Sequence, residues 1–280
     1  MIVGNYALDL VRAGKQIFAI WNNVPNVFLQ EQLAMIGEKT GAWQLIIIDN
    51  EHGAMSWPQV EGLIRATIGT KAFPGYEGKV TPMVRVPESR GVRPEYAKKV
   101  LDAGGLGIMW PFPSFTSVAE VKACIDYTKY KTKDCPDGMR GYAPRRGYSL
   151  SENYAQVIND WVFNVIQIES PEAIDALPEI LELDGVDAVL IGPADLSQRM
   201  GYIENMSAEP VQKAITKAFN ICKSKNVPVG MAGGGGITLE ERIKQGFEIQ
   251  TVSATTALLR IGAEQIVKMI EECGAKIPAI

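Results

Sequence analysis

Eight short apolar runs, separated by segments with helical periodicity, constrain the fold of this 280-residue chain more than any other feature. They lie at residues 18–21, 45–49, 82–86, 107–111, 163–169, 188–192, 227–231 and 249–253. Their hydrophobicity is continuous, not alternating, which is typical of parallel strands covered on both faces. Eight strands that alternate with helices over about 250 residues predict a (β/α)8 TIM barrel of the α/β class.

The segments between the runs carry helix start signals. Ser56 stands shortly before Pro58, and Ser170 stands directly before Pro171. Serine caps the start of a helix, and proline is favoured in its first turn. A doubly wound open sheet would need fewer strands and usually a second domain. No repeat, linker or low-complexity block divides the chain, so we expect residues 1–280 to form one domain.

Charge and composition exclude several classes of partner. The chain has 28 Lys and Arg against 32 Asp and Glu, a formal net charge of -4, which offers no broad attraction to nucleic acid or an anionic membrane. No apolar run approaches the length of about 18 residues that a spanning helix needs, and the first residues lack the apolar core of a signal peptide. Four scattered cysteines without a CxxC pair suit a reducing cytosol. We therefore expect a cytoplasmic protein that acts on a small molecule.

Polar residues at the ends of the predicted strands indicate where the chemistry lies, because the catalytic groups of a barrel project from the carboxyl ends of its strands. The candidates within or directly after the ends of the second, third, fifth and sixth runs are Asp49, Glu51, His52, Arg85, Gln167, Glu169 and Asp195. None of the predicted strands ends in lysine, so the sequence does not support a Schiff-base enzyme.

Glu169 and Asp195 follow consecutive predicted strands, so we expect both carboxylates to face one small volume. Oxygen ligands of this kind suit a hard cation such as Mg2+ or Mn2+, with water and a chelating substrate completing the shell. Alternatively, either acid caps the helix that follows it. Free N–H groups at the helix start beside Asp195 also suit a substrate carboxylate.

His52 and Arg85 are the candidates for proton transfer and charge stabilisation. His52, the only histidine, stands beside acids after a strand, where a base that titrates near neutrality can take a proton from a hydroxyl. Arg85 lies within an apolar run and is costly there unless it is paired or faces a polar site. It either forms a salt bridge with Asp49 or Glu51 or stabilises a developing enolate oxygen. Asp102 either ends a helix or orients His52.

Six motifs give the chain a family resemblance. They are IIIDNEHG, MVRVPE, LDAGGLGIMWP, PDGMRG, IQIES and DGVDAVLIGPADLS. In this order they resemble the HpcH/HpaI aldolase family of metal-dependent class II pyruvate aldolases, over most of residues 15–260. The resemblance implies a lyase that cleaves a 4-hydroxy-2-oxo acid to pyruvate and an aldehyde through a pyruvate enolate. It also implies a divalent metal ion as cofactor, Mg2+ first and Mn2+ or Co2+ as alternatives.

The resemblance implies a role for each candidate residue. Glu169 and Asp195 would bind the metal, and Arg85 would contact the 2-oxo oxygen and the enolate. His52 would transfer the proton as a dyad with Asp102. Pyruvate would be bound by Gln167, Ala194 and Asp195, and Asp49 and Glu51 would lie around the metal-bound waters.

Two departures from the bacterial aldolases leave the second substrate open. The segment from Arg85 to Asp102 is a few residues longer, and WPFPS replaces the commoner Val-Pro-Met pattern. The longer segment is similar to macrophomate synthase, a family member that decarboxylates oxaloacetate and uses the enolate to form carbon–carbon bonds. That reaction is the alternative, together with a lyase of malyl-type thioesters and a non-catalytic barrel that binds an oxo acid or a metal.

The last helical segment, residues 256–272, is amphipathic and packs either on its own barrel or on a neighbour. Related enzymes exchange such a helix between subunits. The resemblance therefore implies a homo-oligomer, a hexamer, with this C-terminal helix on a neighbouring subunit.

Overall fold

The eight predicted strands close into one parallel barrel. The computed structural model describes residues 4–88, 93–115, 117–142 and 154–275, and each strand in it pairs with the next until β8 pairs with β1. The strands are β1 (Ile17–Asn22), β2 (Leu45–Asp49), β3 (Thr81–Arg85), β4 (Gly107–Phe112), β5 (Phe163–Ile168), β6 (Ala188–Ile191), β7 (Val229–Met231) and β8 (Ile249–Ala254). Every predicted run overlaps one strand, and the (β/α)8 fold class is confirmed.

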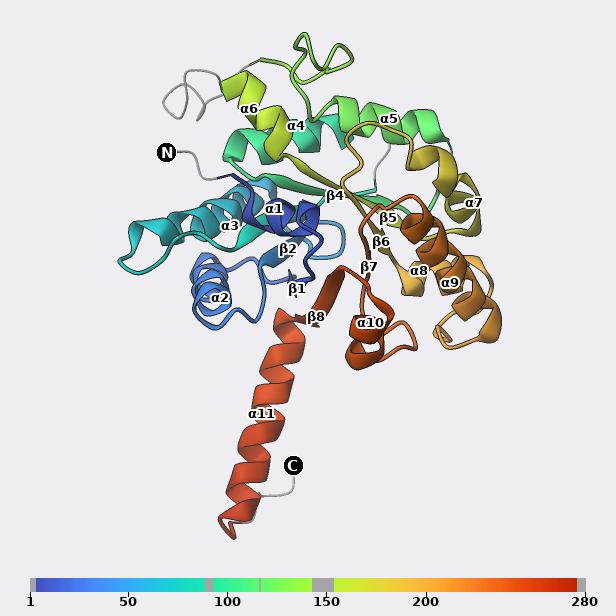
Figure 1. Cartoon of the computed structure of the whole chain (residues 1–280). Coiled ribbons are helices and arrows are strands. Elements are labelled where there is room, and N and C mark those ends of the chain that lie inside the picture. Colours follow the sequence, from blue (N-terminus) through green and yellow to red (C-terminus); the bar gives the residue numbers. More distant parts are fainter. Residues whose placement is uncertain (1–3, 89–92, 116, 143–153, 276–280) are drawn as a thin grey trace.

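Most of the helices surround the barrel (Figure 1). They are α1 (Tyr6–Arg12), α2 (Val27–Thr40), α3 (Trp57–Gly69), the 3-10 turn η1 (Thr70–Ala72), α4 (Arg93–Ala103), α5 (Val118–Asp126), α6 (Tyr154–Trp161), α7 (Pro171–Ile180), α8 (Pro193–Arg199), α9 (Glu209–Ser224), α10 (Leu239–Gln245) and α11 (Thr255–Glu272). Both predicted helix starts are present, at Ser56 and at Ser170. Ser170 accepts a hydrogen bond from the backbone N–H of Ala173 at 3.3 Å, and the N–H of Ser56 donates to the Gln59 side chain at 2.8 Å.

Two helices were not predicted from the sequence. α1 precedes the first apolar run, and α6 lies between the fourth and fifth runs, where no helix was predicted. Each is at most eight residues long, which leaves too few turns for a clear periodic signal. Residues 143–153 of the same stretch lie outside the described residues.

An inner apolar layer fills the barrel and is closed at one end by α1. Its members are buried and include Ile17, Leu45, Ile47, Met83, Met109, Val165, Leu190 and Ile249. Ala7, Leu8 and Val11 of α1 belong to the same cluster, so α1 covers the end at which the strands begin. A second, larger layer lies between the strands and the surrounding helices. The barrel is therefore a packed core, and only its carboxyl end remains for chemistry.

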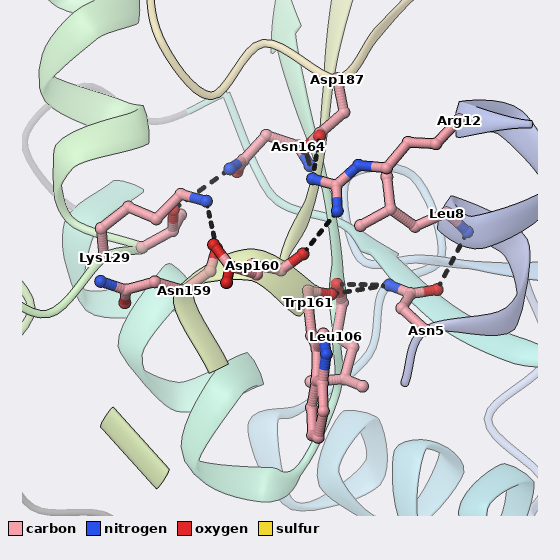
Figure 2. A network of polar contacts seen from close by, with 11 residues as sticks. Asn5, Leu8, Arg12, Leu106, Lys129, Asn159, Asp160, Trp161, Asn164 and Asp187 are labelled. Carbon is pink, nitrogen blue, oxygen red and sulfur yellow. Dashed lines mark hydrogen bonds and ion pairs between the residues drawn. The ribbon is translucent and has the colours of Figure 1, made fainter. Parts of the chain in front are cut away.

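Polar contacts fasten α1 to the connections that precede three strands (Figure 2). Asn5 donates from Nδ2 to the carbonyl oxygens of Leu106 and Trp161, at 3.1 and 3.0 Å. Arg12 donates to the carbonyl oxygen of Asp160 at 2.8 Å and to the carboxylate of Asp187 at 3.0 Å. These bonds tie the start of the chain to the connections before β4, β5 and β6 at the closed end of the barrel.

The last helix leaves the barrel instead of covering it (Figure 1). Of the 18 residues of α11, only Thr255 is buried. Its exposed apolar side chains are Leu259, Ile261, Ile266, Val267, Met269 and Ile270. The predicted amphipathic helix is present. Leu258 near its start packs against the barrel, but the exposed apolar side chains named above have no partner within the described part of the chain. Among the described helices, none has the length and hydropathy needed to cross a membrane.

Candidate active site

The two predicted metal ligands stand on neighbouring turns at the carboxyl end of the barrel. The last residues of β5 and β6 pair with each other, so Glu169 and Gly192, which come next, lie side by side. Asp195 follows in the first turn of α8. Both connections are minimal, because Ser170 already caps α7 and Gly192 already caps α8. The acids are thus attached directly to the rigid sheet.

Glu169 is a buried carboxylate with an incomplete set of partners. Its Oε1 accepts a hydrogen bond from Gln167 Nε2 at 2.6 Å, whereas Glu169 Oε2 and Gln167 Oε1 have no hydrogen-bond partner although both are buried. Burial, followed by the charges of Asp195 and Glu51, raises the pKa of Glu169 well above its usual range, and Arg85 opposes the rise. A bound cation would offset both the burial cost and the repulsion between the carboxylates.

Gly192 provides the space that the Glu169 carboxylate occupies. A Cβ atom at Gly192 would lie 2.5 Å from Glu169 Oε1 and 2.7 Å from its Cγ, far inside van der Waals contact. The backbone of Gly192, with φ -102° and ψ 91°, is one that other residues adopt. Steric space, not backbone conformation, therefore requires glycine here.

Arg85, the last residue of β3, is held from several directions. Its Nε and Nη2 donate to the two carboxylate oxygens of Asp49 at 3.0 and 2.7 Å, and its Nη1 lies 3.1 Å from Glu51 Oε2. Its Cζ stands 4.6 Å from the centre of the Trp21 ring. The salt-bridge interpretation is confirmed for both acids. These contacts engage three of the five N–H groups of a guanidinium, so the pairing is compatible with a further role toward substrate oxygen.

His52 lies on the turn after β2, at the mouth of the barrel. Asp49 Oδ1 accepts hydrogen bonds from the backbone N–H groups of Glu51 and His52, each at 3.2 Å. The Nε2 of His52 lies 3.7 Å from Glu51 Oε2, and the His52 side chain is 65% exposed. Burial raises the pKa of Glu51, although the neighbouring charges of Arg85 and His52 act against the rise. The imidazole thus stands in contact with solvent, where it can exchange protons with water.

Asp102 lies far from His52 in the fold. It belongs to the last turn of α4, just before β4 begins, and therefore lies at the closed end of the barrel. Its carboxylate pairs with Nη2 of Arg140 at 2.9 Å, and the Arg140 guanidinium packs 4.4 Å from the centre of the Tyr130 ring. Among the contacts of the described residues, none joins Asp102 to His52. Within a single chain, Asp102 and His52 are therefore not in contact. Their joint role in proton transfer stays a prediction.

The first turn of α8 presents backbone donors beside the acids. Ala194 and Asp195 occupy this turn, in which N–H groups have no acceptor inside the helix. Ala194 is exposed and Asp195 is half-buried, so both are accessible from the mouth. The arrangement suits a carboxylate group of a substrate.

The donor set fits a hard divalent cation. Glu169 and Asp195 supply oxygen ligands, and the unpaired Glu169 Oε2 is a buried acceptor without a proton donor. In the described residues, no three His, Cys, Asp or Glu side chains form a closed metal-binding cluster. Mg2+ commonly binds proteins through one or two carboxylates and keeps several waters, so two acids are a sufficient protein contribution.

Two site residues were missed from the sequence. Trp21, at the carboxyl end of β1, faces Arg85, and Gly192 makes room for Glu169. Each had a signal in retrospect, because an aromatic residue ended the first predicted strand and a glycine ended the sixth. Neither signal shows which distant side chain the residue contacts.

Residues 30–260 match the family model described as HpcH/HpaI aldolase/citrate lyase. The chain belongs to this family. Membership places it among the carbon–carbon lyases. It is 28% identical over 268 residues to the 4-hydroxy-2-oxo-heptane-1,7-dioate aldolase of Klebsiella pneumoniae, an alignment that covers 94% of this chain and 93% of the relative.

Solved structures of the HpcH/HpaI family share the fold. A family protein from Burkholderia cenocepacia superposes with a TM-score of 0.83 at 25% identity, covering 95% of this chain and 99% of that one. Macrophomate synthase superposes with a TM-score of 0.75 at 21% identity, covering 96% and 90%. The latter likeness establishes a shared barrel and no more. The family resemblance that the six motifs predicted is confirmed.

Proposed function

We propose that the chain cleaves a 4-hydroxy-2-oxo acid to pyruvate and an aldehyde through a pyruvate enolate. The observation that carries this proposal is the position of a buried, incompletely partnered Glu169 beside Asp195, electrostatically coupled to the fixed guanidinium of Arg85. An enolate oxygen is stabilised by a cation, which the acids can hold, and by a fixed positive group close to that cation. The name of the Klebsiella relative, which acts on a 4-hydroxy-2-oxo acid, supports the same substrate class.

Glu169 and Asp195 would hold the divalent metal ion, with Mg2+ preferred for an all-oxygen site and Mn2+ or Co2+ as substitutes. When bound, the metal supplies Lewis-acid stabilisation of the oxygen that becomes negative during cleavage. Gln167 holds the Glu169 carboxylate through its hydrogen bond, and its own Oε1 is buried without a partner. Asp49 and Glu51 hold Arg85 and bring further negative charge to the cation.

Other residues of the chain would bind the substrate and transfer the proton. The N–H groups of Ala194 and Asp195 bind the substrate carboxylate, and Arg85 donates to the 2-oxo oxygen. His52, directly or through water, removes the proton of the C4 hydroxyl. The C3–C4 bond breaks, the aldehyde leaves, and the electron pair moves to the enolate that Arg85 stabilises. Protonation of C3 gives pyruvate.

A substrate panel tests this function. Several 4-hydroxy-2-oxo acids and oxaloacetate are assayed for pyruvate release with Mg2+, Mn2+, Co2+ and EDTA. Metal-dependent release of pyruvate and an aldehyde from a 4-hydroxy-2-oxo acid is the expected result. Turnover of oxaloacetate alone would favour the macrophomate synthase-like alternative. Absence of turnover, together with absence of deuterium exchange into pyruvate in D2O, would favour a non-catalytic barrel.

Substitution of Gly192 tests the metal site without removing a ligand. In Gly192→Ala, the added Cβ displaces the Glu169 carboxylate, and we expect the affinity for Mn2+ to fall roughly 10- to 100-fold, as it does for other disturbed supporting contacts. Titration calorimetry measures the loss. Gly69→Ala, at the end of α3, is the matched control, because a Cβ there would meet no atom within 4 Å. Unchanged Mn2+ affinity in Gly192→Ala would argue against Glu169 as a ligand.

The role of Asp102 can be decided by Asp102→Asn. The Arg140 side chain is fully buried, so loss of its counter-charge is expected to lower the melting temperature measured by calorimetry. Aldol cleavage and oxaloacetate decarboxylation should then decline together, in proportion to the folded protein. Selective loss of aldol cleavage at an unchanged melting temperature is the result that the dyad predicts, and it would contradict a purely structural role.

We also propose that the chain forms a homo-oligomer, a hexamer, in which α11 packs on a neighbouring copy. The exposed apolar face of this 18-residue helix supports the proposal. Introduction of Leu259→Glu and Met269→Glu together is expected to reduce the assembly, as measured by light scattering after size exclusion. Lys268→Glu, an exposed charge change on the same helix, should leave it intact. A wild-type protein that elutes at the monomer mass of 30.6 kDa would overturn the proposal.

A further inference from the structure

Trp21 separates the guanidinium of Arg85 from the apolar interior of the barrel. It lies near the carboxyl end of β1, where it pairs with Ile47 of β2 and Ala254 of β8. Its half-buried side chain packs against the inner apolar layer, and Arg85 Cζ stands 4.6 Å from its ring centre. The indole is therefore a support between the packed core and the positive group.

The contacts of Arg85 constrain its edge and its face differently. Asp49 and Glu51 bind nitrogen atoms along the edge of the planar guanidinium. Trp21 adds a different contact, because Arg85 Cζ lies over its ring at 4.6 Å, within the distance of about 6 Å at which an aromatic ring attracts a guanidinium. Only 9% of the Arg85 side chain is exposed, so little water competes with this attraction. The acids fix the nitrogen atoms, and the ring adds an attraction at the centre of the group.

We propose that Trp21 is a positioning residue that holds the Arg85 guanidinium at the orientation needed to stabilise the enolate. This inference rests on the proposed function, in which Arg85 donates to the 2-oxo oxygen. In this proposal Trp21 acts through Arg85, whose Cζ lies over its ring. A misdirected donor stabilises the developing charge less, so the effect belongs to the chemical step more than to substrate binding.

Substitutions of Trp21 separate this role from simple packing. Trp21→Leu is expected to lower kcat for pyruvate release roughly 2- to 30-fold, with a smaller change in KM and unchanged Mn2+ affinity. Trp21→Phe keeps a ring face and should restore most of kcat. Trp57→Leu is the matched control, because Trp57 is also half-buried and has Lys99 Nζ 5.6 Å from its ring centre, but it lies on α3 outside the site. Its kcat should equal that of the wild type.

A double-mutant cycle identifies the route of the effect. Deuterium exchange into pyruvate, followed by NMR, reports enolisation even in slow variants. In the Arg85→Ala background, Trp21→Leu should cause no additional loss, because the group that Trp21 positions is absent. Should Trp21→Leu not fold, Trp21→Met fills the volume without a ring and gives the same comparison.

Two results would overturn the inference. One is a Trp21→Leu enzyme with the kcat of the wild type, and the other is a full additional loss in the Arg85→Ala background. A wild-type enzyme that releases no pyruvate from any tested acid would instead contradict the proposed function. The two failures are therefore distinguishable.

Discussion

Treatment with EDTA is expected to abolish pyruvate release, and added Mg2+ or Mn2+ to restore it. Metal ions used as Lewis acids supply several kcal/mol of charge stabilisation, and about 4 kcal/mol corresponds to a loss of about a thousandfold in rate. The reason lies in the composition of the site. Among the described ion pairs, Arg85 is the only arginine or lysine that pairs with the acids of the site. Asp49 and Glu51 already balance the charge of Arg85. A continuous pyruvate assay during chelation and readdition measures the effect.

Variants of the two proposed metal ligands, Glu169 and Asp195, test which residues cause the metal dependence. Glu169→Gln and Asp195→Asn remove one carboxylate charge each, so neither should recover full rate when metal is returned. Glu179→Gln is the matched control and should behave as the wild type. Glu179 is exposed and lies on α7, the helix that follows Glu169. Turnover that persists undiminished after thorough chelation would refute the metal-dependent mechanism as a whole.

Replacement of His52 by alanine is expected to separate two reactions of the same enolate. Aldol cleavage requires removal of the C4 hydroxyl proton, and loss of a general base typically costs 10²- to 10⁴-fold. Decarboxylation of oxaloacetate releases CO2 to give the enolate without that proton transfer, so its rate should change little. Parallel assays of the two substrates on one preparation measure the difference.

The decarboxylation assay is itself the internal control for folding, because both reactions share Arg85 and the metal ligands. An Arg85→Ala enzyme should lose both activities, since the enolate is common to them. Comparable loss of both activities in His52→Ala would show that His52 supports the site in another way, and it would contradict its assignment as the base.

The barrel and its principal acids could be predicted from the sequence because both depend on local patterns. Continuous apolar runs indicate buried parallel strands, and residues that follow such runs must lie at one end of a barrel. This reasoning alone placed Glu169, Asp195 and Arg85 at the same end. It also left open whether Arg85 was paired, which the ion pairs with Asp49 and Glu51 now answer.

Features that depend on contacts between distant residues were not predictable in this way. The position of Trp21 against Arg85 joins β1 to β3, and no local pattern encodes it. The partnership of Asp102 with Arg140 likewise joins two segments whose packing the spacing does not define. In α11, periodicity revealed an apolar face but not the direction in which the helix leaves the barrel, because that direction depends on what covers the face.

The minimal turns after β5 and β6 have a practical consequence for engineering. They leave no adjustable loop between the sheet and the two acids, so libraries that alter these turns would disturb the proposed cation site. The connection at residues 232–238, between β7 and α10, is longer and carries no acid or base of the site. Within it, Gly233, Gly235 and Gly236 have positive φ values, whereas a Cβ atom at Gly234 would meet no atom within 4 Å. Laboratory evolution should therefore vary position 234 and leave Glu169 and Gly192 untouched.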